Sequence, residues 1–531
     1  MSDSNGQTGR VLVVRHYRNI IQLSGPGRAK PPSEVVDAIL PRLQYLHKRS
    51  LHGKEAFDSQ TGERRHVEVV CKRLFYWQDG LLHCPRGFVD HVEQRAGQLG
   101  WTVRHVVLDD DRARPDAYRP DPDVLREYDL REGQPAFFQT IMRRVEMRRG
   151  GIVKAVPAFG KSFCLKVLAR LYPHARVLVL VPSIPLLRSV ADDMSRSLPA
   201  VGVIGDGSRT VGRVVVASAH SMGSIDDEWD IVLADEFHEM AADKRSAQFA
   251  RVTSKALVFG LTATPSGRLD GGDAKLEGMA GPVIYEFNWD EALDLDRVSP
   301  VSVRWHDVRL LSDPADGRFG VERKRLGIWR NVERNRIIAR SLVDAAADDK
   351  HVLALVGTVE HALFLQQAFL EVGLPPFCLS YSLRDFKRFD RLGRLDYLGG
   401  LEFGPIDPVE LARTRERFRA GEVRRLIATG TLGVGFSVDS LDVVVRADGL
   451  GGSAIGDEQK GGRVCRKHGD KDVGWVYDYL DQFNRGFHQA ALGRRAIYRG
   501  LGWDEEAHQY LRSIDRPRSK SGSASRRSRG G

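Results

Sequence analysis

A Gly-Lys-Ser triplet at residues 160–162 is the first stretch of this 531-residue chain whose residue types could do chemistry. It closes the segment GIVKAVPAFGKS, in which an apolar run leads through a turn into a predicted helix. Backbone N–H groups at a helix N-terminus hold phosphate oxygens, a lysine reaches the β and γ phosphates, and a hydroxyl binds Mg²⁺. Gly160, Lys161 and Ser162 supply these parts in that order, although Ala155 replaces the first glycine of the G-x-x-x-x-G-K-[ST] pattern. A triplet of this kind also arises by chance, so the phosphate-loop interpretation depends on the rest of the chain.

An acidic pair follows a later apolar run, DIVLADEFHEM. In nucleoside triphosphatases an aspartate at such a place binds Mg²⁺ and a glutamate activates the attacking water. Asp235 and Glu236 have the right types and order for these two roles. The alternative is a helix N-terminal cap, which also favours acidic residues. The position downstream of a phosphate loop favours the catalytic interpretation.

Two arginines, Arg463 and Arg466, lie in the segment QKGGRVCRK, with Gln459 one turn earlier. If the segment is helical, positions i and i+3 share one face and both guanidinium groups can enter one cleft. Such a pair is usually a solvated helix face. In the second of two α/β halves, it also suits arginine fingers that reach a γ-phosphate.

Alternating apolar strands and helices predict an α/β fold with a doubly wound parallel sheet from about residue 128 onward. Ligands of such folds bind beyond the carboxyl ends of the strands, where the phosphate loop and the acidic pair lie. A second series of the same kind follows a connection near residues 282–331. The predicted strands are GIVKAV, RVLVLVPS, RVVVASAH, DIVLADE and ALVFGLTAT in the first half, and HVLALVGT, RRLIATGT, LDVVVRAD and VGWVYDYLD in the second.

The flanks of these two halves have a different character. Residues 1–120 predict a small α+β module, with strands VLVVRHY and IIQLSG, a helix SEVVDAILPRLQYLH and an Asp79-Gly80 hairpin. A Pro-rich segment, residues 112–123, is interpreted as a linker. Residues 381–407 are longer than an ordinary connection and rich in Arg, Phe and Tyr, so they are either a disordered insert or a nucleic-acid-contacting loop. The basic tail, residues 506–531, predicts disorder.

The composition is that of a globular protein with a basic surface. Apolar residues make up 42%, charged residues 28%, and the formal net charge is +10, which favours a polyanionic partner or simply a well-solvated surface. No apolar run is long enough to span a bilayer and no signal peptide is evident, so we expect a cytoplasmic protein without a membrane partner. The five cysteines form no C-x-x-C pair, which predicts reduced thiols.

Taken in order, these motifs resemble those of the superfamily 2 helicases and translocases. Leu130-Arg131-Glu132-Gly133-Gln134 is similar to the adenine-recognising segment, AVPAFGKS to motif I, VPSIPLL to motif Ia and DEFH to motif II. GLTATP resembles motif III, IATGTLGVGFSVDSLDVVV motif V and QKGGRVCR motif VI. The resemblance covers residues 125–485 and is nearest to the D-E-x-H group that contains XPB-like repair helicases and phage branch-migration helicases. Departures from the family pattern are Ala155, Ala158, Phe237 and Ser437.

The resemblance implies two RecA-like lobes in tandem, residues 121–290 and 291–505, with ATP and Mg²⁺ as cofactors. It implies that Gln134 reads adenine, that Asp235 and Ser162 bind Mg²⁺, and that Glu236 activates water. His238 and Gln459 would link the γ-phosphate to the lobe interface, which Arg463 and Arg466 complete. The remaining implied nucleotide contacts are Ala158, Phe159, Gly160 and Lys161, and the implied nucleic-acid contacts are Pro182, Ser183, Ser218 and Thr429.

The function that this resemblance implies is an ATP-dependent DNA helicase or duplex translocase acting in repair, recombination or replication. Its partner would be single-stranded, duplex or branched DNA. Three alternatives stay open: an RNA helicase, the motor subunit of a restriction or defence complex, and a nucleic-acid binder without activity. The intact Lys161, Glu236 and Arg466 disfavour the third of these.

Overall fold

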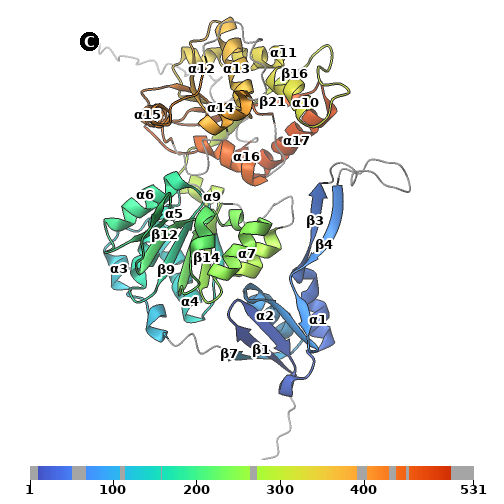
Figure 1. Cartoon of the computed structure of the whole chain (residues 1–531), viewed down its shortest axis with the longest axis vertical. Coiled ribbons are helices and arrows are strands. Elements are labelled where there is room, and N and C mark those ends of the chain that lie inside the picture. Colours follow the sequence, from blue (N-terminus) through green and yellow to red (C-terminus); the bar gives the residue numbers. More distant parts are fainter. Residues whose placement is uncertain are drawn as a thin grey trace, which may run out of the picture. The chain divides into compact units, whose positions relative to one another are not determined.

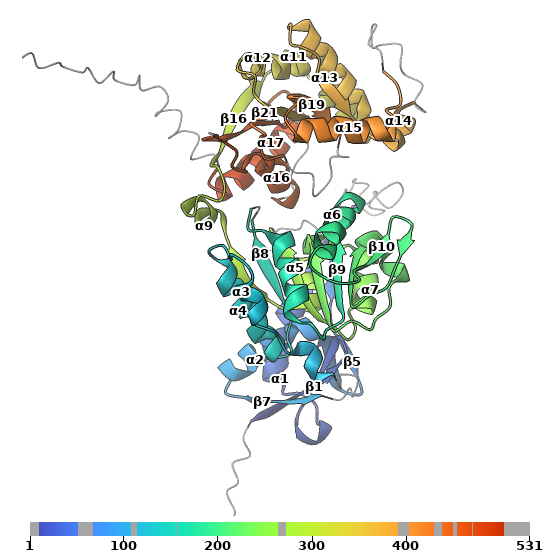
Figure 2. The same cartoon turned by 90° about the vertical axis from the view of Figure 1, so that its left-hand side faces the viewer.

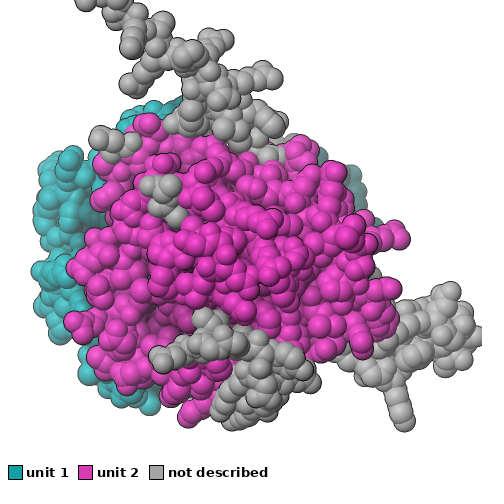
Figure 3. All heavy atoms as spheres, turned by 90° about the horizontal axis from the view of Figure 1, so that it is seen from above, with its two compact units in different colours: residues 1–298, 433–436, 453–459 teal, residues 299–432, 437–452, 460–531 magenta. Residues whose placement is uncertain are grey.

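A computed structural model of the chain describes residues 10–50, 67–107, 114–156, 158–263, 272–390, 403–429, 438–449, 454–469 and 471–503. The chain divides into two compact units (Figure 3). Unit 1 contains residues 1–298 together with 433–436 and 453–459, and unit 2 contains the remainder. The domain boundaries expected near residues 120, 290 and 505 stay a prediction, and the basic tail, residues 506–531, lies outside the described residues.

Unit 1 begins with the α+β module. Its five-stranded sheet has the order β5-β6-β2-β1-β7 and carries two helices on the face that holds the apolar cluster of this module (Figure 1). The expected Asp79-Gly80 hairpin is present, because both residues have positive φ and join two antiparallel strands. The elements are β1 (Val11–Tyr17), β2 (Ile20–Ser24), α1 (Ser33–Ile39), β5 (Tyr76–Gln78), β6 (Leu81–Pro85), α2 (Val89–Gln98) and β7 (Thr102–Val107).

Two expectations for this region are wrong. The helix predicted over residues 33–47 ends at Ile39, because Pro41 lacks a backbone N–H donor and cannot sit inside a helix. The chain continues instead into β3 (Gln44–Ser50), which pairs with β4 (Val67–Arg73) as a separate two-stranded ribbon. The described part of the Pro-rich segment is not a free linker. Its Arg114 pairs with Asp230 at 3.0 Å, and Ala117 is buried against the body of the unit.

The second part of unit 1, here called lobe 1, is built on an eight-stranded sheet of order β11-β10-β12-β9-β13-β14-β8-β15. Every pairing is parallel except that between β10 and β11. All five strands predicted for the first half are present, whereas β10, β11 and β15 were not predicted. The strands are β8 (Gly151–Ala155), β9 (Val177–Val181), β10 (Gly202–Gly205), β11 (Ser208–Arg209), β12 (Val214–Ser218), β13 (Ile231–Asp235), β14 (Leu257–Thr262) and β15 (Val283–Phe287).

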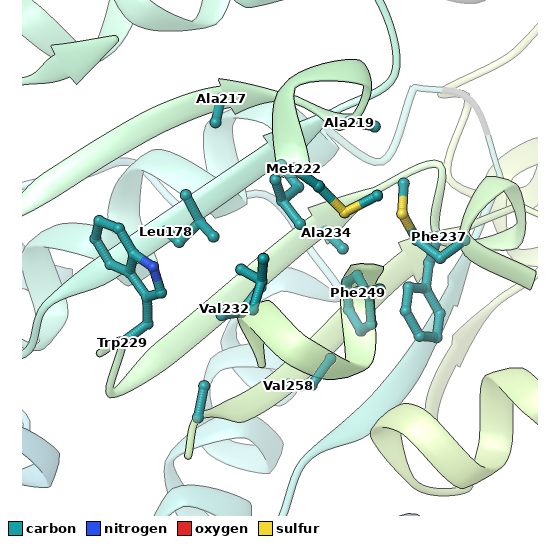
Figure 4. Packing of buried hydrophobic residues seen from close by; sticks show 14 of the residues in the cluster. Leu178, Ala217, Ala219, Met222, Trp229, Val232, Ala234, Phe237, Phe249 and Val258 are labelled. Carbon is teal, nitrogen blue, oxygen red and sulfur yellow. The ribbon is translucent and has the colours of Figure 1, made fainter. Parts of the chain in front are cut away.

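Helices cover both faces of this sheet. On one face α7 (Asp243–Val252) and α8 (Asp273–Ala280) close an apolar cluster in which Leu178, Val232 and Val258 of the sheet meet Phe237 and Phe249 (Figure 4). On the other face lie α5 (Lys161–Leu171) and α6 (Ile184–Ser195) (Figure 2). Strands β12, β9, β13, β14 and β8 are buried over almost their whole length, as expected for a sheet covered on both sides.

Unit 2, here called lobe 2, carries a six-stranded parallel sheet of order β16-β21-β20-β17-β19-β18. Helices α11 (Val332–Ser341) and α13 (Val359–Glu371) pack on one face through an apolar cluster, and α17 (Arg485–Gly500) packs on β21. The α/β fold with two parallel sheets is confirmed. The strands are β16 (Val301–Val308), β17 (Val352–Leu355), β18 (Cys378–Ser380), β19 (Arg425–Ala428), β20 (Val443–Val445) and β21 (Gly474–Asp481), of which β16 and β18 were not predicted.

Buried ion pairs hold the last elements of lobe 2 together. Arg494 of α17 donates to both carboxylate oxygens of Asp478 at 2.9 and 2.7 Å, and Arg334 of α11 does the same to Asp481 at 2.7 and 3.2 Å. All four side chains are fully buried. Such pairs are strongly destabilised when one partner is removed, because a charge is then left buried without compensation.

Candidate nucleotide site

The phosphate loop lies at the carboxyl end of β8, where α5 begins. Gly160 is the N-cap of α5 in the left-handed region with φ 89°, and Ala158 also has a positive φ of 71°. Glycine adopts this conformation without strain, so Gly160 frees the backbone to turn into the helix. Lys161 is the first residue of α5, and its Nζ donates to the carbonyl oxygen of Ala155 at 3.0 Å. The side chain of Ser162 is exposed at the same helix end.

Gln134 is almost completely buried and holds the phosphate loop from behind. Its Nε2 donates to the carbonyl oxygen of Phe159 at 2.9 Å, and its Oε1 accepts from the backbone N–H of Arg131 at 3.0 Å. Both ends of the amide are therefore fixed by the chain itself. The expected role of Gln134 in reading adenine stays a prediction, and the structure adds a direct link between this side chain and the loop.

Phe159 anchors the loop through its side chain rather than offering it to a ligand. Its ring is 3% exposed and contacts the rings of Phe137, Tyr285 and Phe287, with centroids 5.0 to 5.8 Å apart. Any contact that Phe159 makes with a nucleotide would therefore come from its backbone.

Asp235 and Glu236 lie at the carboxyl end of β13, two strands from β8 in the sheet. Burial raises the pKa of Asp235 to about 6, Glu236 adds to the rise, and Lys161 opposes it. Burial likewise raises the pKa of Glu236 above its ordinary value, again with Lys161 in opposition. Raised carboxylate pKa values beside a fixed cation are typical of functional sites. Strands β13 and β8 both run parallel to β14 between them, so the acids after β13 and the loop after β8 lie at the same edge of the sheet.

His238 connects the acidic pair to the next strand. Its Nδ1 lies 2.9 Å from Thr262 Oγ1 at the end of β14 and 3.5 Å from Glu236 Oε2. Within unit 1, its Nε2 lies 3.4 Å from Gln459 Nε2. The sequence motifs implied that His238 and Gln459 link the γ-phosphate to the lobe interface, and that role stays a prediction. Thr264 and Pro265 of the third motif lie outside the described residues.

The presence of a phenylalanine at position 237, between polar residues, is explained by a glycine that the sequence analysis did not single out. The ring of Phe237 is fully buried beside Phe249 with centroids 5.6 Å apart (Figure 4), and it lies directly over Gly260 of β14. A Cβ placed on Gly260 would be 2.2 Å from that ring. The backbone that carries Asp235 and Glu236 is therefore seated on a strand position that only glycine fits. The apolar residue in a polar motif was the signal that could have led to this partner.

The two arginines of the second half do not share a helix face, so that expectation is wrong. Helix α16 (Ala454–Gly461) contains Gln459 but ends before the arginines. Arg463 lies in a 3₁₀ segment, where burial lowers the pKa of its guanidinium to about 10. Arg466 follows that segment, is about two-fifths exposed and pairs with Asp439 at 3.1 Å. Consecutive glycines, Gly461 and Gly462, mark the change, because glycine weakens an α-helix.

The residues expected to touch nucleic acid lie at strand ends, but three of the four are buried: Pro182, Ser218 and Thr429. Ser218 is fully buried, and its Oγ accepts from the backbone N–H of His220. Thr429 is 3% exposed, and its Oγ1 lies 3.5 Å from Asp385 Oδ2. Pro182 and Ser183 follow β9, and Ser183 is the N-cap residue of α6. These nucleic-acid contacts stay predictions. The full burial of the Ser218 side chain gives no support to the contact predicted for Ser218.

The residues at the phosphate loop fit a nucleotide with Mg²⁺. Glu236 Oε2 is buried and accepts no hydrogen bond from the described part of the chain, which leaves an oxygen ready for a water molecule. Ser162 and Asp235 supply a hydroxyl and a carboxylate, oxygen ligands that Mg²⁺ prefers. Over the described ranges, no group of three or more His, Cys, Asp or Glu side chains is placed to hold a metal ion.

Comparison with known proteins gives one family match, over part of the chain. Residues 127–267 match the family model described as Type III restriction enzyme, res subunit. This range begins just before the segment containing Gln134, extends past the acidic pair and lies within unit 1. Among curated proteins, none matches the sequence.

Several solved structures are similar to this chain. Phage T4 UvsW is 17% identical over 92% of this chain and 97% of its own, with a TM-score of 0.36. The Type ISP restriction-modification enzyme LlaBIII bound to DNA is 16% identical over 85% of this chain and 36% of its own, with a TM-score of 0.48. Dbp5 of S. cerevisiae bound to RNA and ADP BeF3 is 15% identical over 75% of this chain and 98% of its own, with a TM-score of 0.46. Among the helices in the described part of the chain, none is both long and apolar enough to cross a membrane.

Proposed function

We propose that this helicase-type protein is an ATP-dependent DNA translocase or helicase that remodels DNA in repair, recombination or replication. The observation that carries the proposal is the convergence of Lys161, Asp235 and Glu236 at one edge of the lobe 1 sheet. There the charge of Lys161 opposes the rise in pKa of each acid. DNA is favoured over RNA because the family model that matches lobe 1 is described as a restriction-enzyme subunit.

The proposed roles follow from the positions of the side chains. Lys161 exchanges its bond to the Ala155 carbonyl for phosphate oxygens, and the N–H groups at the start of α5 hold the same phosphates. Mg²⁺, held by Ser162 and Asp235, neutralises phosphate charge when it is bound. Glu236 accepts the proton of a water placed at its free Oε2, and its raised pKa brings it nearer the pH at which it works.

Coupling to nucleic acid requires that turnover depend on the polymer. His238 lies between Glu236 and Thr262 and also contacts Gln459 of α16. It is therefore placed to transmit changes in the nucleotide site to Gln459. Arg463 and Arg466 are proposed to contact the γ-phosphate in the catalytically competent state.

The test is Lys161→Ala measured with a panel of polymers. Turnover of ATP should be lost, since the lysine is the fixed cation beside the β and γ phosphates, whereas DNA binding should survive. Lys166→Ala is a matched control on the same helix, because Lys166 is paired with Asp193 at 3.0 Å. Hydrolysis by the parent protein is measured with single-stranded, duplex, forked and four-way DNA and with RNA. Stimulation by RNA alone would overturn the choice of DNA, and parental turnover in Lys161→Ala would overturn the site.

A second candidate is the motor subunit of a restriction or defence complex. The family match over residues 127–267 favours it, because that family is described as a restriction-enzyme subunit. The motor would then work with a separate nuclease. This candidate predicts DNA-stimulated ATP hydrolysis without DNA cleavage by the purified chain, which a turnover assay and a cleavage assay on one preparation can check.

A further inference from the structure

Helix α14 (Leu383–Asp390) of lobe 2 has two sharply different faces. Phe386 and Phe389 are buried in a small apolar cluster of their own, against Val359, Leu363 and Tyr381. Tyr381 also donates to the carbonyl oxygen of Gly404 at 2.8 Å, which ties the two described ends of the 381–407 insert together. The described part of the insert is therefore a packed element of lobe 2.

The opposite face of α14 carries Arg384, Lys387 and Arg388, all exposed. Positions 384, 387 and 388 fall on one side of a helix, away from positions 386 and 389. Within the described residues, none of the three basic side chains has a carboxylate partner. Two other arginines of lobe 2 do have one: Arg336 pairs with Glu333 and Glu371, and Arg417 with Glu422.

The helix's own carboxylate does not neutralise this face. Asp385 accepts a hydrogen bond from Ser382 Oγ at 2.9 Å, and its backbone N–H donates back to Ser382 Oγ at 3.1 Å. This reciprocal bonding caps the start of α14 and directs Asp385 toward the sheet. Three positive charges are left in the solvent on an ordered helix.

The place of α14 in the fold connects it to the proposed nucleic-acid contacts. It follows β18 at the carboxyl edge of the sheet, and Ser380 of β18 pairs with Ala428 of β19. The next residue, Thr429, donates its backbone N–H to the Ser380 carbonyl at 3.1 Å and lies 3.5 Å from Asp385 through its Oγ1. Ligands of parallel α/β sheets bind at this edge. The basic face therefore begins beside Thr429, one of the residues expected to touch the nucleic-acid backbone.

We infer that Arg384, Lys387 and Arg388 form a phosphate-binding face that extends the nucleic-acid track of lobe 2 beyond Thr429. The inference rests on the proposed function as a nucleic-acid motor. A solvated helix face is the ordinary explanation of basic residues, but it does not account for the gathering, at the ligand edge of the sheet, of three charges without a carboxylate partner among the described residues. Guanidinium groups match phosphate oxygens in pairs, and such contacts carry no base information. The ligand is thus a nucleic-acid backbone of any sequence.

The test compares two triple variants of the full chain. Arg384→Gln with Lys387→Gln and Arg388→Gln removes the proposed face. Arg318→Gln with Arg340→Gln and Lys350→Gln removes the same charge from exposed positions elsewhere in lobe 2 and is the control. Binding of a fluorescent single-stranded oligonucleotide is measured from low to moderate salt, and ATP turnover is measured with and without it. Circular dichroism and melting temperature check that both variants fold.

The α14 variant should show a slope of log affinity against log salt that is shallower by about 2, since each phosphate contact on a single strand contributes about 0.7. The oligonucleotide concentration for half-maximal stimulation should rise on the order of 10- to 100-fold at ~0.1 M salt, with basal and maximal turnover unchanged. Replacing Arg384 and Arg388 by lysine should retain the parental slope.

Two outcomes would overturn the inference and are distinguishable. If the parent protein binds the oligonucleotide and the two triple variants have the same slope, α14 is a solvated face and the proposed function stands. If the parent protein neither binds nucleic acid nor responds to it, the proposed function fails and the inference fails with it.

Discussion

Buried carboxylates have opposite surroundings in the two lobes. In lobe 1 the buried pair Asp235 and Glu236 has raised pKa values, because burial outweighs the opposing effect of Lys161, and one Glu236 oxygen accepts no hydrogen bond from the described residues. In lobe 2 Asp448 has a pKa well below its usual range, although burial alone would raise it. Its oxygens accept from Arg446 at 3.0 Å and from Lys460 at 2.6 Å.

This difference in pKa distinguishes carboxylates with a chemical role from carboxylates with a structural role. A carboxylate that stays uncompensated costs stability, so it persists where a ligand or a reaction needs it. A carboxylate with two cationic partners organises the fold. In lobe 2, Asp448 binds Lys460, the residue after Gln459. The three fully buried arginines among the described residues, Arg334, Arg446 and Arg494, all lie in this lobe.

The largest effect should come from an arginine of lobe 2 that has a functional rather than a structural role. Arg466→Ala should lower nucleic-acid-stimulated turnover on the order of 10³-fold, as arginine fingers supply, while melting temperature and both ligand affinities are retained. Its ion pair with Asp439 is exposed, so losing the pair costs about 0–1 kcal/mol. Asp439→Asn is the control, because it breaks the same pair and should keep turnover. Normal stimulated turnover in Arg466→Ala would show that Arg466 has no role in ATP hydrolysis.

A structural arginine of the same lobe should behave in the opposite way. Arg494→Ala should destabilise lobe 2 by about 3–5 kcal/mol, because Asp478 is left as a buried charge without its partner. Amide hydrogen exchange should report faster opening in residues 299–503 than in residues 114–263. Arg336→Ala, which breaks an exposed pair, should change exchange little. Equal effects of the two substitutions would show that burial does not govern these pairs.

In lobe 1 the sensitive position is an apolar contact under the acidic pair. Gly260→Ala should cost about 1–3 kcal/mol through overpacking against Phe237 and should lower turnover by displacing Asp235 and Glu236. The double variant Gly260→Ala with Phe237→Leu relieves the clash and should recover part of the turnover. Nucleotide affinity and turnover measured on both variants decide the point. A fully active Gly260→Ala would mean that motif II is seated by other contacts.

The smallest effect concerns pH and again distinguishes the lobes. Burial lowers the pKa of His361 in lobe 2 to about 3, so the folded state keeps this ring neutral. The unfolded state takes up a proton below about 6.5, and stability should therefore fall as pH falls from 6.5 toward 3. At pH 5.5 the loss relative to neutral pH is about 1.4 kcal/mol for this one group. Chemical denaturation of the parent and of His361→Leu across this range gives the difference, which should vanish if the ring is protonated in the folded state.

The order of motifs and the apolar runs were sufficient to predict the α/β fold, the central strands of both sheets and the residues of the phosphate loop. These features are local, since a strand buried on both faces and a turn that opens a helix depend mainly on the adjacent residues. The position of Asp235 and Glu236 at the end of β13 was predicted from the apolar run that precedes them. Their convergence with Lys161 could be expected because parallel strands bring their carboxyl ends to one edge.

Tertiary structure decided what depends on partners far away in the chain. Arg334 pairs with Asp481, and Phe237 packs on Gly260. The sequence around each of these residues does not predict which distant residue is its partner. The short or edge strands β10, β15, β16 and β18 were missed for the same reason, because their neighbours in the sheet complete them. Ser218 had the right motif position but is closed off by packing, and Arg466 left the helix face expected for it. Burial and long-range pairing are properties of the assembled sheet, so the apolar pattern alone does not determine which polar groups stay open for chemistry.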